Sequence, residues 1–207
     1  MPKNRKAVAK VLSSKIVFHG DIFDVRKERV REPEGVLADR DVVTHPGSVV
    51  VMPVFPDGRI LMIRQYRHSA KQYLWELVAG RKDPGETFLH GAHRELKEET
   101  GTDKARILAE LDDWLSYDLP DEVAGRVWRG RFKGQTQKWF ALAFTGTDAD
   151  IDLTAHTPEF KAWRWMPLDA VARAIVAFKR PIYERVAREF APIAARLAAE
   201  SDGQKAD

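Results

Sequence analysis

The chain has 207 residues, of which 44% are hydrophobic and 31% are charged, a balance typical of a globular domain and unlike that of a disordered chain. It contains no cysteine, which excludes a disulfide scaffold, a zinc site built on thiolates and a cysteine nucleophile. The net charge of +3 arises from 34 basic and 31 acidic residues, an excess too small to predict a nucleic-acid partner by itself. The length predicts one main domain. No apolar run approaches membrane-spanning length, so we expect no membrane contact, and the absence of cysteine favours a cytoplasmic location.

The front half of the chain is predicted to be rich in strands. Apolar residues recur at short spacing in the segments 15–32 and 37–55, with turns expected at Gly35 and at Pro46-Gly47. Asp57-Gly58 lies between two apolar runs, which is a strong signal for a hairpin. We therefore expect a sheet to begin well before the middle of the chain.

The back half is predicted to mix strands with helices. Residues 87–100 have a helical pattern that ends at Gly101, a typical C-cap. Further strands are expected in the middle of the back half, and two helices follow near the end, Asp169–Lys179 and Ile182–Glu200, divided by Pro181.

These patterns predict three parts of the chain. Residues 1–44 should form a small strand-rich extension, and residues 45–198 should form the main domain. Residues 199–207 are polar and are expected to be a disordered tail.

Three acids are crowded on the helix predicted over residues 87–100. Glu95, Glu98 and Glu99 are three and four positions apart or adjacent, so they share one side of a helix and repel each other. Hard divalent cations such as Mg²⁺ take oxygen ligands and bridge carboxylates to substrate phosphates. The crowding therefore predicts a metal site.

The segment that contains these acids resembles the signature box of the Nudix hydrolases. It runs Gly80, five residues, Glu86, seven residues, then Arg-Glu-Leu-Lys-Glu-Glu-Thr-Gly from Arg94 to Gly101. Every charged and glycine position of the box is filled, and the one departure is Thr102, where the family has an aliphatic residue. The resemblance implies an α/β protein with the Nudix fold, a mixed β-sheet in an α/β/α sandwich, and hydrolysis of a phosphoanhydride.

The resemblance also implies a ligand set for the metal. Glu95 and Glu99 would be the principal ligands of Mg²⁺, for which Mn²⁺ is a possible substitute. Glu98 would be a third ligand or the acid that positions the attacking water, and the backbone carbonyl of Ala79 would supply a further oxygen. Bound metal would neutralise phosphate oxygens and orient the water.

Other positions of the box have structural roles by the same resemblance. Glu86 and Arg94 would hold the preceding loop to the helix by ion pairing, and Gly80 and Gly101 would be structural positions of the box. The alternative is a solvated acidic helix face that Arg94 and Lys97 partly compensate.

Outside the box, the front half resembles the bacterial ADP-ribose pyrophosphatases. The segments that carry this resemblance are GDIFDVRKERV, VVTHPGSVVVMPV, IRQYRHS and LWELVAG. The resemblance implies that Arg67 helps to bind the substrate, with Arg40 as a further candidate, and that the N-terminal strands build a homodimer.

From about Ala109 onward, the chain instead resembles the RNA pyrophosphohydrolases and dinucleoside polyphosphate hydrolases. The segments are ELDDWLSYDLP, RGRFKGQTQKWFALAFTG, PEFKAWRWMPL and FKRPIYERVAREFAP. In that group the acid matching Glu159 is a candidate general base or extra ligand, and Tyr117, Lys138 and Phe140 lie where nucleotide or phosphate is contacted. The alternatives are packing for Tyr117 and a solvated lysine for Lys138.

The signature of each subfamily is half complete. The Ser-Pro-Gly-Phe-like segment of the ADP-ribose group is missing after the box, and the Pro-Gln-Gly-Gly run of the RNA group is missing before it. A recombinant of two parents, natural or engineered, accounts for both observations. The first hypothesis for the substrate is a dinucleoside polyphosphate or a triphosphorylated RNA end, the second is ADP-ribose, and a non-catalytic nucleotide-binding protein is the third.

Overall fold

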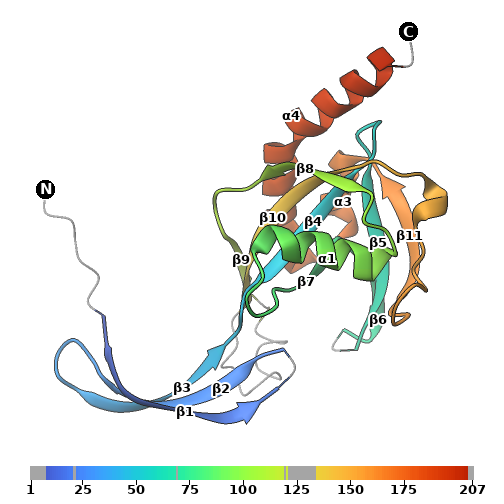
Figure 1. Ribbon diagram of the computed structural model, residues 1–207. Helices are drawn as coiled ribbons and strands as arrows, with labels where there is room; N and C mark the ends of the chain where they lie inside the picture. Colours follow the sequence, from blue (N-terminus) through green and yellow to red (C-terminus); the bar gives the residue numbers. More distant parts are fainter. Residues whose placement is uncertain (1–7, 21, 69, 119, 121–133, 205–207) are drawn as a thin grey trace, which may run out of the picture. The chain divides into compact units, whose positions relative to one another are not determined.

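The structure is a computed structural model and describes residues 8–20, 22–68, 70–118, 120 and 134–204. The chain divides into two compact units, residues 1–46 and 47–207. Each unit has its own sheet (Figure 1).

The first unit is an antiparallel sheet of three strands, β1 (Lys10–His19), β2 (Asp24–Arg31) and β3 (Leu37–Thr44). The predicted turn at Gly35 is confirmed, with a φ of 88° that glycine adopts without strain. Among the described residues of this unit, Val30 is the one buried hydrophobic side chain, and β1 is exposed along its whole length. The unit therefore has strands but almost no core of its own.

The second unit is built on a mixed eight-stranded sheet. Its strands are β4 (Ser48–Val54), β5 (Ile60–Arg67), β6 (Gln72–Glu76), β7 (Val78–Arg81), β8 (Ala105–Glu110), β9 (Leu115–Asp118), β10 (Gly134–Phe144) and β11 (Phe160–Met166). The main order is β11-β5-β4-β10-β8, in which β10 is parallel to β4 and antiparallel to β8. Strands β6, β7 and β9 pair with β5, β4 and β10. The predicted hairpin at Asp57-Gly58 is confirmed, since Gly58 has a φ of 85° and the flanking strands are antiparallel.

Helices cover both faces of this sheet (Figure 1). They are α1 (Phe88–Thr100), α3 (Leu168–Ala174) and α4 (Arg180–Gln204), with short 3-10 turns η2 (Asp148–Asp150) and η3 (Ala177–Lys179). Strand β4 supplies both cores by alternation: Val49 and Val51 pack in one cluster with Leu96 of α1, whereas Val50 and Met52 pack in the other with residues of α3 and α4. This arrangement confirms the expected α/β/α sandwich. Among the described residues, no helix is long and apolar enough to cross a membrane.

Boundaries near the C-terminus differ from the expectation. The helix expected over residues 169–179 ends at Ala174, and a 3-10 turn precedes α4. Pro181 is the second residue of α4, where a proline is tolerated because its missing N–H would have no helical partner. The helix continues through residues 199–204, which corrects the expected tail, because Ala199 and Glu200 at the start of that segment are strong helix formers.

Candidate active site

Helix α1 is fixed at both ends by local hydrogen bonds. The Thr87 hydroxyl accepts a bond from the backbone N–H of His90 at 3.2 Å. Gly101 ends the helix with a φ of 74°, and its N–H donates to the carbonyl of Lys97 at 2.8 Å. Leu96 anchors the inner face of the helix in the core beneath it. The helix predicted over residues 87–100 with Gly101 as its C-cap is therefore confirmed, and its register sets which way the acids point.

This register brings Glu95 against the backbone of Gly80 in β7. A β-carbon built on Gly80 would lie 2.0 Å from the Glu95 carboxyl carbon and from one of its oxygens, far inside van der Waals contact. Gly80 pairs with Val49 of β4, which holds its backbone in the sheet. The absence of a side chain at Gly80 therefore leaves the space that the Glu95 carboxylate fills.

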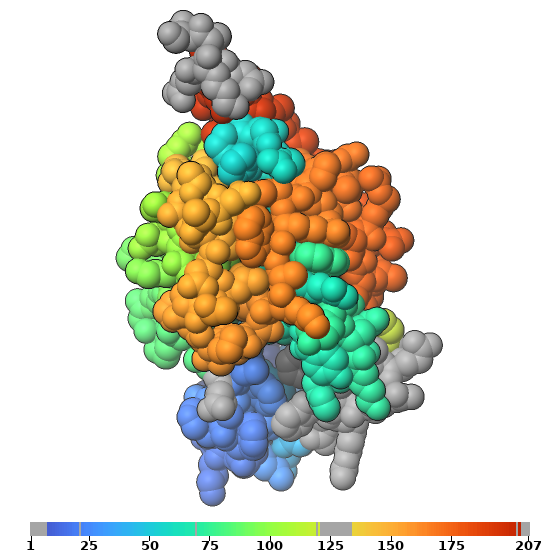
Figure 2. All heavy atoms as spheres, turned by 90° about the vertical axis from the view of Figure 1, so that its right-hand side faces the viewer, coloured from blue at the N-terminus to red at the C-terminus, as the bar shows by residue number. Residues whose placement is uncertain are grey.

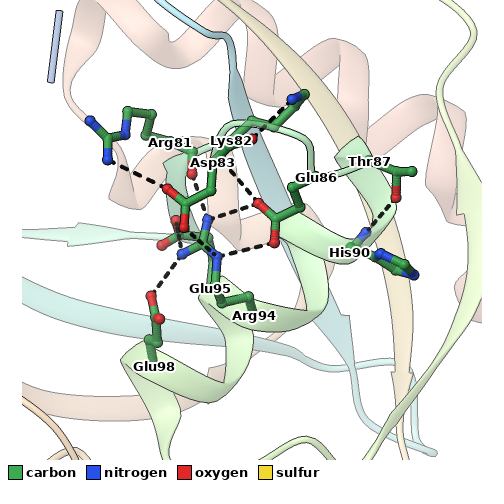
Figure 3. A network of polar contacts seen from close by, with 9 residues as sticks. All are labelled: Arg81, Lys82, Asp83, Glu86, Thr87, His90, Arg94, Glu95 and Glu98. Carbon is green, nitrogen blue, oxygen red and sulfur yellow. Dashed lines mark hydrogen bonds and ion pairs between the residues drawn. The ribbon is translucent and has the colours of Figure 1, made fainter.

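Arg94 lies at the centre of a network of carboxylates (Figure 3). Its Nε and one terminal nitrogen donate to Glu86 at 3.1 and 3.2 Å, and the other terminal nitrogen donates to Glu95 and Glu98 at 2.9 and 2.8 Å. A further bond of 2.6 Å reaches the carbonyl of Arg81. The hydrogen bond from Arg94 lowers the pKa of Glu86. This arginine therefore joins the loop before α1 to the helix and partly neutralises the acids.

Two of the acids are shielded from solvent, since Glu95 is buried and Glu99 is half-buried. Glu99 accepts a hydrogen bond from the N–H of Ala79 at 3.1 Å, and burial together with the charge of Glu95 raises the pKa of Glu99 well above its usual range. Burial also raises the pKa of Glu95, although the charge of Arg94 opposes this shift. In the folded chain the ionised forms of both acids are therefore less favourable than in water.

The donor set of this site fits a hard divalent cation. The carboxylates of Glu95, Glu98 and Glu99 and the carbonyl of Ala79 offer only oxygen, which Mg²⁺ prefers. A bound cation would favour the ionised carboxylates and so oppose the rise in pKa that desolvation causes at Glu95 and Glu99. In the described part of the chain, however, no three acidic or histidine side chains converge closely enough to hold an ion. The acids take different partners instead, because Arg94 binds Glu95 and Glu98 while Glu99 accepts from Ala79.

A second polar group surrounds Glu76, a buried acid that the sequence analysis did not single out. Arg67 donates to both carboxylate oxygens of Glu76, at 3.1 and 2.5 Å, and the Lys179 ammonium lies 3.9 Å from the same carboxylate. Lys179 is also 5.4 Å from the ring centroid of Tyr117. The charge of Glu99 acts on Arg67, so this group is linked electrostatically to the acidic helix.

The group around Glu76 carries an excess of positive charge. Arg67 and Lys179 face a single carboxylate, and burial lowers the pKa of Lys179 although Glu76 opposes the shift. Burial and the charge of Glu76 raise the pKa of Tyr117, so its hydroxyl stays protonated at neutral pH and donates to Gln135 at 3.1 Å. One signal in the sequence could have identified Glu76: it interrupts the otherwise apolar segment LWELVAG.

Two residues expected to contact the substrate serve the fold instead. The Lys138 ammonium donates to the carbonyls of Leu111 and Asp112 at 2.5 and 3.2 Å and lies 2.9 Å from the Glu110 carboxylate. Because an ammonium has three donors, these acceptors use all of them. Phe140 is completely buried beneath α1, so its ring is inaccessible and the expected nucleotide contact is wrong. The middle of β10 is enclosed on both faces, which the sequence resemblance did not reveal.

Glu159 and Arg40 are the remaining candidates. Glu159 is exposed, and one oxygen of its carboxylate accepts a 2.8 Å bond from Gln65 of β5. Within the described residues it makes no hydrogen bond to the acids of α1, and its second oxygen is open to a proton donor. Arg40 belongs to the first unit, where it pairs with Glu32.

The fold and the site together define a class of α/β/α sandwich proteins in which an acidic helix packs on a glycine-containing strand. The sequence matches the NUDIX domain over residues 44–186, and the chain belongs to the Nudix family. It is therefore a Nudix hydrolase acting on pyrophosphate bonds.

Its relatives include RNA pyrophosphohydrolases. The chain is 52% identical over 132 residues to the RNA pyrophosphohydrolase of Bradyrhizobium sp. (strain ORS 278), covering 61% of this chain and 79% of that protein. It is 44% identical over 156 residues to the one from Rhodopseudomonas palustris (strain ATCC BAA-98 / CGA009), covering 72% and 93%. Among solved structures, an ADP compounds hydrolase superimposes with a TM-score of 0.56 at 17% identity, covering 88% of this chain and 93% of that one, a likeness that shows the fold alone. Recombination between two parents stays a prediction.

Proposed function

We propose that the chain is a Mg²⁺-dependent pyrophosphohydrolase that acts on triphosphorylated RNA 5′ ends or dinucleoside polyphosphates. The observation that carries the proposal is the set of three acids on α1 beside the backbone of β7, two of which have pKa values raised by desolvation. The curated relatives described as RNA pyrophosphohydrolases support the substrate class.

The metal would be held by Glu95, Glu98 and Glu99, with the Ala79 carbonyl as a further ligand. Bound Mg²⁺ supplies neutralisation of phosphate oxygens and a lowered pKa for a bound water. Arg94 donates hydrogen bonds to Glu95 and Glu98 and so partly neutralises two of these acids. Mn²⁺ can take the same oxygen donors.

The chain's own groups would bind the phosphates and move the proton. Arg67 provides positive charge that interacts with Glu99, and Lys179 adds a second cation beside Glu76, so that both are proposed to bind phosphate oxygens. Glu159 is the proposed general base, since one of its oxygens is oriented by Gln65 and the other is open. Water forms a new P–O bond, the anhydride P–O bond breaks, and the proton of the water passes to the base.

A substrate panel tests this proposal. The purified protein is incubated with Mg²⁺ and, in parallel, triphosphorylated RNA, diadenosine polyphosphates and ADP-ribose, and the initial rate is measured for each. A higher kcat/KM for RNA or dinucleoside polyphosphates is the expected result. Turnover that needs no divalent cation would contradict the metal assignment, and preference for ADP-ribose would contradict the substrate assignment.

ADP-ribose is a second candidate because Arg67 is hydrogen-bonded to Glu76 and interacts electrostatically with Glu99. That geometry lets one arginine contact a diphosphate next to the acids. If ADP-ribose is the substrate, Arg67→Gln should raise its KM at least tenfold while the rates on RNA stay low.

We also propose that the first unit forms a homodimer. Its exposed strand β1 carries large apolar side chains, and among them are Val11, Leu12, Ile16 and Val17. A three-stranded sheet with one buried hydrophobic residue in its described part needs further cover to be stable. Sedimentation of the wild type as a dimer, and of Ile16→Asp as a monomer, is the expected outcome; a wild-type monomer would contradict it.

A further inference from the structure

A cluster of aromatic and basic side chains on β5, β6 and β11 has no part in the site described above. We call it the aromatic-basic surface, and it consists of Arg64, Tyr66, Tyr73, Trp75, Lys161 and Arg164. Strand register places Arg64 opposite Trp75 and Tyr66 opposite Tyr73. Figure 2 shows the hairpin of β5 and β6 side by side with the region of β11 on one face.

Two rings of this surface, Tyr73 and Trp75, each lie beneath two cations. The guanidinium of Arg64 lies 5.4 Å from the Tyr73 centroid and 5.9 Å from the Trp75 centroid. Lys161 lies 5.0 Å from Tyr73, and Arg164 lies 4.0 Å from Trp75. The rings and the positive charges therefore alternate over one continuous area.

Among the residues that the structure describes, the three cations of the surface have no acidic partner. In the described part of the chain, Arg64, Lys161 and Arg164 take part in no ion pair, and the buried Nε of Arg64 has no hydrogen-bond acceptor. Arg67 and Arg94, in contrast, are both paired with carboxylates. The aromatic-basic surface is thus a site of uncompensated positive charge.

On β5, the residues of the aromatic-basic surface directly follow the buried core residues of the same side. Along β5, Ile60 and Met62 are fully buried on the same side from which Arg64 and Tyr66 project. Tyr66 is 47% and Tyr73 41% exposed, and their ring centroids are 5.3 Å apart in an edge-on arrangement.

We propose that the aromatic-basic surface binds single-stranded nucleic acid, namely the part of an RNA chain that follows the 5′ end. Every base has a face that stacks on an aromatic ring, and the phosphate backbone is attracted to unpaired cations. Successive residues of a strand point to opposite faces, so Arg67 and Glu76 lie on the other side of the hairpin from their neighbours Tyr66 and Trp75. One hairpin thereby carries both the phosphate-binding pair and the surface for the following nucleotides. This inference rests on the proposed function, since it assumes an RNA substrate.

The first test removes charge. The probe is a labelled single-stranded RNA of roughly 12 nucleotides with a 5′ hydroxyl, a length within the usual range for such surfaces, which a pyrophosphohydrolase cannot cleave. The double variant Lys161→Gln/Arg164→Gln should bind about tenfold more weakly than the wild type, and the slope of log K against log salt should fall by about 1.4, that is ~0.7 for each phosphate that the variant no longer neutralises. The matched control is Arg188→Gln/Arg196→Gln, which removes two exposed arginines from α4; it should keep the wild-type slope.

The second test removes rings and leaves the charge unchanged. Tyr66→Ser/Tyr73→Ser should weaken binding by about tenfold or more, as expected when base stacking is removed, with the salt slope unaltered. Melting curves by circular dichroism show that the variants remain folded, and Tyr66→Ser alone is the milder variant if the double one unfolds. A ring variant that binds as tightly as the wild type while folded would overturn the stacking role.

Hydrolysis separates this inference from the proposed function. All variants should hydrolyse diadenosine tetraphosphate at the wild-type rate, but their KM for a long triphosphorylated RNA should rise about tenfold. If the wild type hydrolyses triphosphorylated RNA yet does not bind the 5′-hydroxyl probe, or if both double charge variants bind it equally, the surface assignment is wrong and the proposed function stands. Binding of the probe through this surface without any RNA hydrolysis would support the surface and overturn the proposed RNA substrate.

Discussion

The Glu95 carboxylate occupies the space that a β-carbon on Gly80 would take, with 2.0 Å between the two positions. Gly80→Ala should therefore displace the carboxylate while leaving the sheet intact, because the flexible end of a side chain moves more easily than β7. A misplacement of about 1 Å at a catalytic centre can cost roughly 100-fold in rate. We expect kcat/KM to fall by about that factor, with a melting temperature close to that of the wild type.

Gly203 offers the control for this substitution. A β-carbon built there meets no heavy atom within 4 Å, so Gly203→Ala should leave activity unchanged. Wild-type activity in Gly80→Ala would show that Glu95 is not needed at this position.

Replacement of Glu99 by glutamine should separate activity from stability. Burial and the charge of Glu95 raise the pKa of Glu99, so its ionised form destabilises the metal-free fold. Glu99→Gln should lower turnover by at least about 100-fold, more than the usual loss of an outer-shell partner, and should keep or raise the metal-free melting temperature. The exposed Glu184→Gln is the control and should behave as the wild type.

The sign of the pH dependence follows from the same shift. The stability associated with protonated Glu99 is fully present below the unfolded pKa and is lost as the pH rises through the raised folded pKa. Metal-free wild type should therefore melt at lower temperature as the pH rises through this range, and the decline should be smaller in Glu99→Gln. An identical pH profile for the two proteins would contradict the raised pKa.

Arg94 should contribute more to stability than an exposed arginine with a similar number of partners. Its side chain is 24% exposed and binds Glu86, Glu95 and Glu98, and removing one partner of a buried ion pair costs about 3–5 kcal/mol. We expect Arg94→Gln to lower the free energy of unfolding in urea by about 3 kcal/mol. Arg185→Gln, whose side chain is 40% exposed beside Asp113 and Glu189, should lower it by no more than about 1 kcal/mol.

Lys138 should prove structural. Lys138→Met leaves the carbonyls of Leu111 and Asp112 without their donor, and a buried unsatisfied group costs about 1–3 kcal/mol. The expected result is that the free energy of unfolding in urea falls by that amount while KM is unchanged. A tenfold higher KM at unchanged stability would instead restore Lys138 as a phosphate contact.

Asp150 should contribute to the stability of the fold, and this contribution should be lost in strong acid. A hydrogen bond from Lys104, at 2.6 Å, and one from the Thr147 N–H lower the pKa of Asp150 from 3.8 to about 2. A lowered folded pKa contributes stability that is present above the unfolded value of 3.8 and is lost as the pH falls through about 2. The melting temperatures of wild type and Asp150→Asn should therefore differ at neutral pH and converge in this acid range; a difference that stays constant would contradict the shift.

Local features of the site were readable from the sequence. The start of α1 at Thr87 and its end at Gly101 follow from capping interactions within one or two turns. The spacing of Glu95, Glu98 and Glu99 on one helical side follows from the helical repeat alone. Such features depend on neighbours in the chain, so a single sequence is enough to predict them.

Only the tertiary structure decided which distant residues meet. Glu76 lies between Arg67 and Lys179 because β5, β6 and the turn before α4 converge, and no local pattern specifies that convergence. The burial of Phe140 and Lys138 could not be predicted, because strand order, and not residue type, determines that β10 is covered on both sides. The sequence by itself determined the acidic helix and the family to which its spacing belongs; burial, and with it the pKa shifts and the uncompensated charges, required the packing of the whole sheet, since desolvation depends on every surrounding element.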